Sequence, residues 1–148
     1  MGKTRFSVHL LSCLILGGFL GCTNKEPPNH KLERGVTMKA RSKQEANGEV
    51  AFEGIIRRTL SYNDEMMLCH FIMKEGGKIP LHDHRASQIG YVVSGSVRFL
   101  NKEGEEAFIA STGDSYVFDP YQVHGAEALE DSELIETFYP PREEYKDF

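Results

Sequence analysis

The 148-residue chain has the composition of an ordinary globular protein, with 40% apolar and 26% charged residues. Its formal charge of −5, without an evident basic face, argues against nucleic acid as a partner. The length corresponds to one domain, with room for a tail.

Residues 1–21 have the features of a bacterial export signal. Lys3 and Arg5 precede an apolar stretch that is too short for a comfortable transmembrane helix. The stretch ends in FLGC, which resembles a bacterial lipobox, although Phe19 stands where leucine is usual. We therefore predict that Cys22 is lipidated and anchors the protein to a membrane, facing the periplasm or the exterior. The alternatives are a plain secretory signal, which would release the protein, and an uncleaved anchor.

Residues 22–48 are polar, contain a proline pair and show no sustained period, which predicts a flexible tether. Residues 35–40 are its best candidate for an added edge strand. Cys13 would leave with the signal and Cys22 would carry the lipid, so the remaining Cys69 cannot form an internal disulfide. The apolar neighbours of Cys69 predict a buried, inert thiol.

Short runs rich in β-branched and aromatic residues follow, each bounded by Gly, Asn, Asp or Pro. No helical pattern separates them. This spacing predicts an all-β, single-domain sandwich or barrel over residues 49–140, followed by a C-terminal tail at 141–148. The runs are residues 49–61, 65–75, 88–95, 96–104, 105–111, 114–120 and 132–140.

Two histidines and a glutamine have the spacing of neighbours on one face of an extended chain. His82 and His84 are two residues apart, and Gln88 follows at an even separation. His124, from a distant strand, would complete a set of three imidazoles and one amide oxygen. Such a set suits one divalent first-row metal per chain (Zn, Ni, Fe or Mn) and leaves positions open for substrate or water. The alternatives are a decorative surface pair and a hydrogen-bonded core histidine, which is also the interpretation for His70.

The spacing resembles the two motifs of the cupin superfamily. The first motif falls on Gly76, His82, His84, Gln88 and Gly95, with glutamine in place of the usual glutamate. The second falls on Gly113, Asp114, Pro120 and His124, with the proline shifted by one position and Tyr121 in place of a usual glycine. The resemblance covers about residues 50–140. It implies a double-stranded β-helix, or jelly roll, with a metal site inside its mouth, and a homodimer formed through edge strands.

A narrower resemblance is to the small cupins of pectin and alginate breakdown, which convert 4,5-unsaturated uronates to the linear keto acid. These proteins share the His-x-His pair, a glutamine, a later histidine, and an ending of an acidic residue, Phe and Pro-Pro-Arg. The resemblance implies the metal ligands His82, His84, Gln88 and His124 and the catalytic residues Glu136, Phe138 and Arg142. Glu136 stands where that family has aspartate, which lengthens the acid by one methylene.

The resemblance also implies a role for each catalytic residue. Arg142 would hold the substrate carboxylate through two parallel hydrogen bonds. Glu136 would move protons as the hemiacetal opens and the enol becomes a ketone. Phe138 would form an apolar wall. The alternatives are a surface ion pair for Arg142, a solvated strand residue for Glu136 and a core residue for Phe138.

The predicted function is therefore a metal-dependent, isomerase-type step on a small sugar acid, in carbohydrate metabolism. Gln88, unlike a glutamate, is neutral and leaves the metal more positive charge with which to polarise an anionic substrate. The alternatives are a non-catalytic, lipid-tethered cupin that binds metal or sugar acid and, less favoured, a dioxygenase. Uronate enzymes of this type are generally expected inside the cell, so the predicted anchor also raises the possibility of a changed substrate.

Overall fold

The computed structural model describes residues 40–146 of the protein. The predicted signal, the lipidation site at Cys22 and the tether up to residue 39 lie outside the described residues, as does nearly all of the possible edge strand at 35–40. Within the described part of the chain, no helix is long and apolar enough to cross a membrane.

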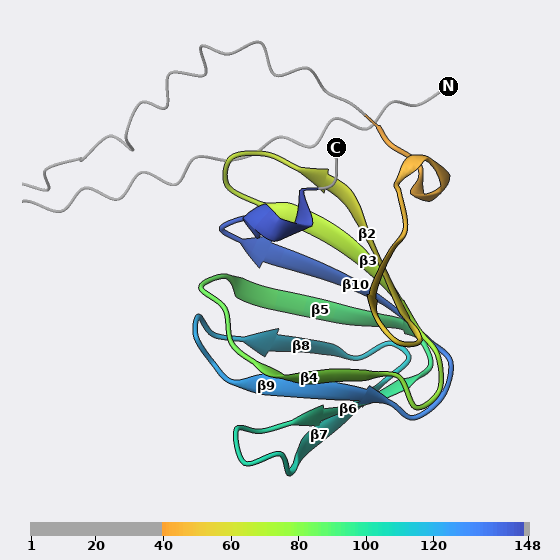
Figure 1. Ribbon diagram of the computed structural model, residues 1–148, viewed down its shortest axis with the longest axis vertical. Coiled ribbons are helices and arrows are strands. Elements are labelled where there is room, and N and C mark those ends of the chain that lie inside the picture. Colours follow the sequence, from red (N-terminus) through yellow and green to blue (C-terminus); the bar gives the residue numbers. More distant parts are fainter. Residues whose placement is uncertain (1–39, 147–148) are drawn as a thin grey trace, which may run out of the picture. The chain divides into compact units, whose positions relative to one another are not determined.

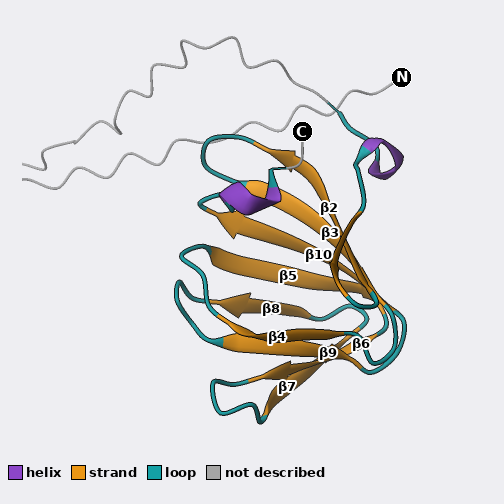
Figure 2. Cartoon of the chain, in the orientation of Figure 1, coloured by secondary structure: helices purple, strands orange, loops and turns teal. Residues whose placement is uncertain are grey.

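Two antiparallel sheets form the barrel (Figures 1 and 2). In spatial order, the first sheet contains β1 (Glu49–Phe52), β2 (Ile55–Tyr62), β3 (Met67–Met73), β10 (Ser132–Tyr139), β5 (Ser87–Ser94) and β8 (Ser115–Phe118). The second contains β4 (Lys78–His82), β9 (His124–Ala128), β6 (Ser96–Leu100) and β7 (Glu106–Ser111). Two 3₁₀ helices, η1 (Lys43–Glu45) and η2 (Glu143–Tyr145), flank the strands. The predicted all-β jelly roll is confirmed.

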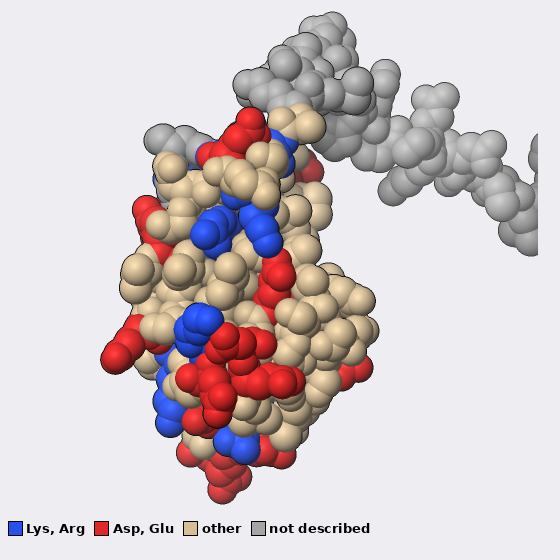
Figure 3. Space-filling model, turned by 90° about the vertical axis from the view of Figure 1, so that its right-hand side faces the viewer, with Lys and Arg blue, Asp and Glu red and all other residues tan. Residues whose placement is uncertain are grey.

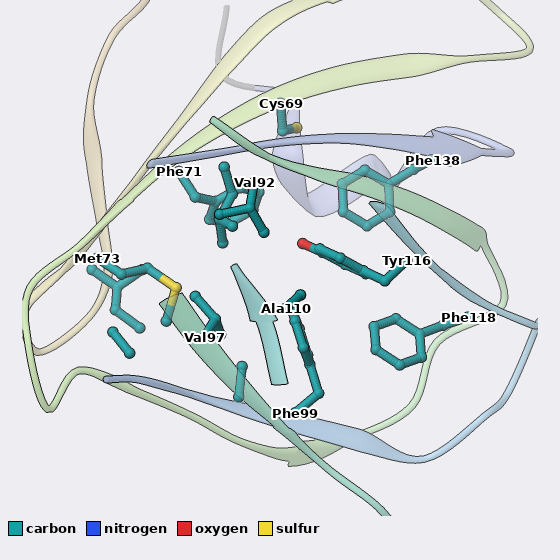
Figure 4. Packing of buried hydrophobic residues seen from close by; sticks show 14 of the residues in the cluster. Cys69, Phe71, Met73, Val92, Val97, Phe99, Ala110, Tyr116, Phe118 and Phe138 are labelled. Atoms are coloured by element: carbon teal, nitrogen blue, oxygen red, sulfur yellow. The ribbon is translucent and has the colours of Figure 1, made fainter. Parts of the chain in front are cut away.

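The core lies between the two sheets, because alternate side chains of each strand point inward. In β10 every second residue from Ser132 to Phe138 is buried. Aromatic rings from both sheets meet in the middle: Phe99 lies 4.4 Å from Tyr116 and 5.5 Å from Phe118 between ring centroids (Figure 4). Cys69 is fully buried in this core, as its apolar neighbours predict.

The strands differ from the predicted runs in three places, one of which is β4, a strand outside every predicted run. The run at 49–61 is a hairpin of β1 and β2, because the chain turns at Gly54, whose φ of 74° lies in the left-handed region that favours glycine. Strand β9 was not predicted, since its sequence HGAEA has little β propensity. Its hydrogen-bonded neighbours β4 and β6 hold it extended instead.

The residues just before β1 contact the outer face of the six-stranded sheet. Lys43 forms an ion pair with Glu133 of β10 at 2.8 Å, and Ala46 is buried. His70 of β3 faces the same side and shares a hydrogen bond with Glu133 at 2.6 Å. The predicted tether therefore ends in residues that contact the barrel, and His70 is a buried, hydrogen-bonded residue outside the barrel interior.

Candidate metal centre and active site

One end of the barrel gathers the predicted metal-binding side chains. His82 is the last residue of β4 and lies directly opposite His124, the first residue of β9. Gln88 is the second residue of β5, and His84 lies in the loop just beyond β4. In Figure 1 this is the end at which β10 finishes and η2 begins.

The three imidazoles converge on one point. Each offers a ring nitrogen, and these three atoms lie within 4.8 Å of one another. The ring centroids are 4.5 Å apart for His82 and His124 and 5.2 Å apart for His84 and His124. The predicted histidine set is thus brought together, although strand β4 ends before His84.

Backbone carbonyls fix the tautomer of all three histidines. Nδ1 of His82 donates to the carbonyl of Pro80 at 2.9 Å, and Nδ1 of His124 donates to that of Gln122 at 2.7 Å. Nδ1 of His84 likewise donates to the carbonyl of Ala86 at 2.8 Å. A carbonyl only accepts, so each neutral ring keeps its lone pair on Nε2. This is the orientation that metal-binding histidines adopt.

The histidines are also held in the neutral form. Burial lowers the pKa of His82 and His84, with a smaller contribution from the positive charge of Arg142. Burial lowers the pKa of His124 to about 4. Neutral imidazole is the form that binds a metal, so little proton release is needed at neutral pH.

The position of Gln88 fits a metal among these nitrogens. Its Nε2 donates to Oε1 of Glu136 at 2.8 Å, which fixes the amide orientation. Its Oε1 then lies 3.0 Å from Nε2 of His84. Both atoms are acceptors when His84 donates through Nδ1, so their lone pairs repel each other unless a cation binds both. The donor set of three imidazoles and one amide suits Zn, Ni, Fe or Mn.

A cavity of about 260 Å³ opens beside this centre. Its walls are largely apolar and include Phe71, Phe99 and Phe138. Phe138 is only 1% exposed and its ring lies 5.8 Å from that of His84, so it is both a core residue and a cavity wall. The polar side chains that line the cavity include His82, His124, Gln88, Glu136 and Arg142.

Glu136 points into the barrel. It occupies an inward position of β10 between Leu134 and Phe138 and is 6% exposed, so the solvated alternative is wrong. Burial raises the pKa of Glu136 to about 7, although hydrogen bonds from Tyr116 and Gln88 act in the opposite direction. A carboxyl group with this pKa is present in both protonation states near neutral pH, which suits proton transfer.

Arg142 is held beside the cavity. Its Nε donates to Glu144 at 2.7 Å, and its guanidinium lies 4.2 Å from the ring centre of Tyr145. The side chain is 13% exposed. Arg142 therefore makes the predicted ion pair and also lines the cavity. Among the described cavity-lining residues it is the only Lys or Arg.

The structural roles of two residues near the site, Tyr121 and Tyr116, were not predicted from the sequence. Tyr121 has a φ of 62°, which explains why glycine is usual at this position. Its N–H donates to the carbonyl of His84 at 2.8 Å, but its exposed side chain does not line the cavity. Tyr116 was not predicted as a site residue, yet its hydroxyl donates to Glu136 at 2.5 Å. The alternation of Tyr116 and Phe118 in β8 is the only sequence signal for an inward ring here.

Comparisons with known proteins show which family the chain belongs to. Residues 69–137 match the family model described as cupin domain. The chain is 38% identical over 96 residues to the pectin degradation protein KdgF of Dickeya dadantii, covering 63% of this chain and 84% of that protein. The chain belongs to the cupin family. It is also 36% identical over 80 residues to the H2HPP isomerase of Bacillus subtilis, and this match spans 53% of the chain and a third (33%) of that protein.

Solved cupins have the same fold. An RmlC-like cupin from Shewanella frigidimarina superposes with a TM-score of 0.66 at 30% identity, covering 74% of this chain and 96% of that one. The structure of KdgF from a Halomonas species gives 0.65 at 30% identity, with 72% and 98% coverage. The predicted likeness to the KdgF-type cupins is thereby confirmed.

Proposed function

We propose that this cupin is a metal-dependent enzyme that opens 4,5-unsaturated uronates and converts them to the linear keto acid. The observation that supports this most strongly is the cavity that three of the four metal donors share with the Glu136 carboxyl and the Arg142 guanidinium. The relatives named for pectin degradation and for an isomerase point in the same direction.

The donors His82, His84, His124 and Gln88 would hold the metal. When bound, the metal supplies a Lewis acid that stabilises negative charge on substrate oxygens. Arg142 would bind the substrate carboxylate, since its charge is opposite and its guanidinium matches the carboxylate geometry. The apolar wall that includes Phe138 would contact the ring and exclude water.

Glu136 would transfer protons in the isomerisation. The C1 hydroxyl loses its proton and the ring oxygen gains one as the bond between C1 and the ring oxygen breaks, which yields an aldehyde and an enol. The enol hydroxyl then loses its proton while C4 gains one, which gives the ketone, so atoms and charge balance without a co-reactant. A carboxyl group whose pKa is raised to about 7 both accepts and donates protons near neutral pH.

Substitution of Glu136 by glutamine tests this proposal. The variant keeps the shape of the side chain but cannot carry the proton, so we expect kcat to fall by at least about 100-fold while bound metal is retained. The loss of ultraviolet absorbance of a 4,5-unsaturated uronate measures turnover. Glu133→Gln is the matched control, because Glu133 lies on the same strand and faces outward.

Two outcomes would contradict the proposal. Uronate decay that is no faster with the wild-type protein than without it would exclude the activity. Wild-type turnover in Glu136→Gln would exclude Glu136 as the proton carrier. A metal-loaded protein that binds a sugar acid without converting it would instead be the non-catalytic cupin.

The location outside the cytoplasmic membrane is a further proposal, which rests on the FLGC stretch and Cys22 alone. Labelling of cells with a radioactive fatty acid tests it, and Cys22→Ala is expected to abolish the label.

A further inference from the structure

Two hydrogen bonds converge on one oxygen of Glu136. The hydroxyl of Tyr116 donates to Oε1 at 2.5 Å, and Nε2 of Gln88 donates to the same atom at 2.8 Å. Oε2 accepts no hydrogen bond from residues 40–146, and Glu136 lines the cavity. The two oxygens of this carboxyl group therefore differ: Oε1 is anchored, and Oε2 is available to a bound molecule.

Tyr116 reaches Glu136 by crossing an intervening strand. Tyr116 of β8 lies opposite Gly90 of β5, and Gly90 lies opposite Glu136 of β10. A Cβ atom at Gly90 would lie 2.1 Å from Cζ of Tyr116, so only glycine lets the ring pass over β5. Figure 4 shows the ring of Tyr116 among the buried aromatic residues, with its hydroxyl directed toward the middle of the barrel.

The same contact bears on the metal centre. Gln88 donates its amide N–H to the oxygen that Tyr116 holds, and this bond turns the amide oxygen of Gln88 toward His84. Loss of the Tyr116 hydroxyl would free the carboxyl group to rotate. The amide of Gln88 would then lose the fixed partner that orients it.

We propose that Tyr116 is a positioning residue that, across Gly90, holds Glu136 with Oε2 toward the substrate and Gln88 with its amide oxygen toward the metal. The catalytic part of this inference rests on the proposed function. The part that concerns Gln88 does not, because it predicts a change at the metal centre whether or not uronates are substrates.

Tyr116→Phe tests the inference, because it removes the hydroxyl and keeps the ring that fills the core. We expect kcat for the unsaturated uronate to fall about 10- to 100-fold, the range seen when outer partners of metal ligands are removed, with KM changed by less than about twofold. Tyr91→Phe is the matched control, since Tyr91 lies on β5 with an exposed side chain on the outer face. It is expected to behave as the wild type.

A second measurement is independent of turnover. Protein loaded with Co²⁺ is compared by visible absorption and by competition with a chelator. We expect Tyr116→Phe to shift the Co²⁺ bands and to weaken Co²⁺ binding, and Tyr91→Phe to do neither.

The two measurements together decide the inference. A change in kcat, in the Co²⁺ bands or in Co²⁺ affinity that is specific to Tyr116→Phe supports it. Wild-type kcat, Co²⁺ bands and Co²⁺ affinity in that variant overturn it. If the wild-type protein lacks turnover but binds Co²⁺, the proposed function fails and the Co²⁺ comparison still decides the inference. If the wild type binds no Co²⁺, both the proposed function and the inference about Tyr116 fail.

Discussion

At the scale of single residues, the site combines groups whose charges are controlled by their surroundings. Burial keeps three histidines neutral, and it also raises the pKa of Glu136 to about 7. Among the described residues that line the cavity, Arg142 is the only Lys or Arg. The proposed substrate, a small sugar acid, carries negative charge and exchanges a proton, so its chemistry matches that of these groups.

The role of Arg142 leads to a prediction about binding. Arg142→Gln removes the charge that would face the substrate carboxylate, so we expect KM for the uronate to rise about 10- to 100-fold, the loss of one charge-assisted hydrogen-bonded contact. The kcat should change much less. Steady-state kinetics with the acid and with its neutral methyl ester separate charge recognition from general damage.

The control for this prediction is Arg98→Gln, since Arg98 pairs with Glu106 and Glu127 away from the cavity. An equal rise in KM for the methyl ester and the acid would show that Arg142 does not recognise the carboxylate.

At the scale of elements, pairing of strands explains what the sequence could and could not predict. The His-x-His pair, Gln88 and His124 were predictable, because two motifs with fixed spacing identify them. The role of Tyr116 was not predictable, since its contact with Glu136 depends on the register of three strands. The residues that this register aligns, Gly90, Tyr116 and Glu136, are 20 or more positions apart in the chain. The burial of His70 on the outer face of the sheet was not predictable either. It depends on the residues before β1, whose polar sequence shows no hydrophobic period.

The crossing of Tyr116 over Gly90 gives a prediction about stability. Gly90→Ala places a methyl group where the Tyr116 ring lies, and we expect it to lower the free energy of unfolding by about 3 kcal/mol, as overpacking does. In a Tyr116→Leu background the clashing ring atoms are gone, so the same substitution should cost much less. Urea unfolding of the four proteins measures the coupling.

A cost of Gly90→Ala that is the same in both backgrounds would contradict the proposed close approach. Gly104→Ala does not provide a clean comparison, because Gly104 has a φ of 80° and would be strained for another reason. Ser94→Ala is the better control, since Ser94 lies on the same strand β5 and is exposed.

At the scale of the whole molecule, the barrel presents a mixed surface around one internal site. On the face shown in Figure 3, Lys and Arg side chains lie beside Asp and Glu side chains, so this face has no continuous basic surface. The fold was predicted from strand spacing and the cupin motifs. The homodimer, the lipid anchor at Cys22 and the division into signal, tether, barrel and tail stay predictions.

The measurement that tests the account most directly is the metal content of the purified protein. We expect about one first-row metal ion per wild-type chain, because four neutral donors converge at one point. The double variant His82→Ala/His124→Ala removes two of these donors and should contain none. Elemental analysis after loading with Zn, Ni, Fe or Mn gives the ratio. A wild-type protein that binds no metal under any loading condition, or a double variant that binds as much as the wild type, would contradict the metal centre and the function built on it.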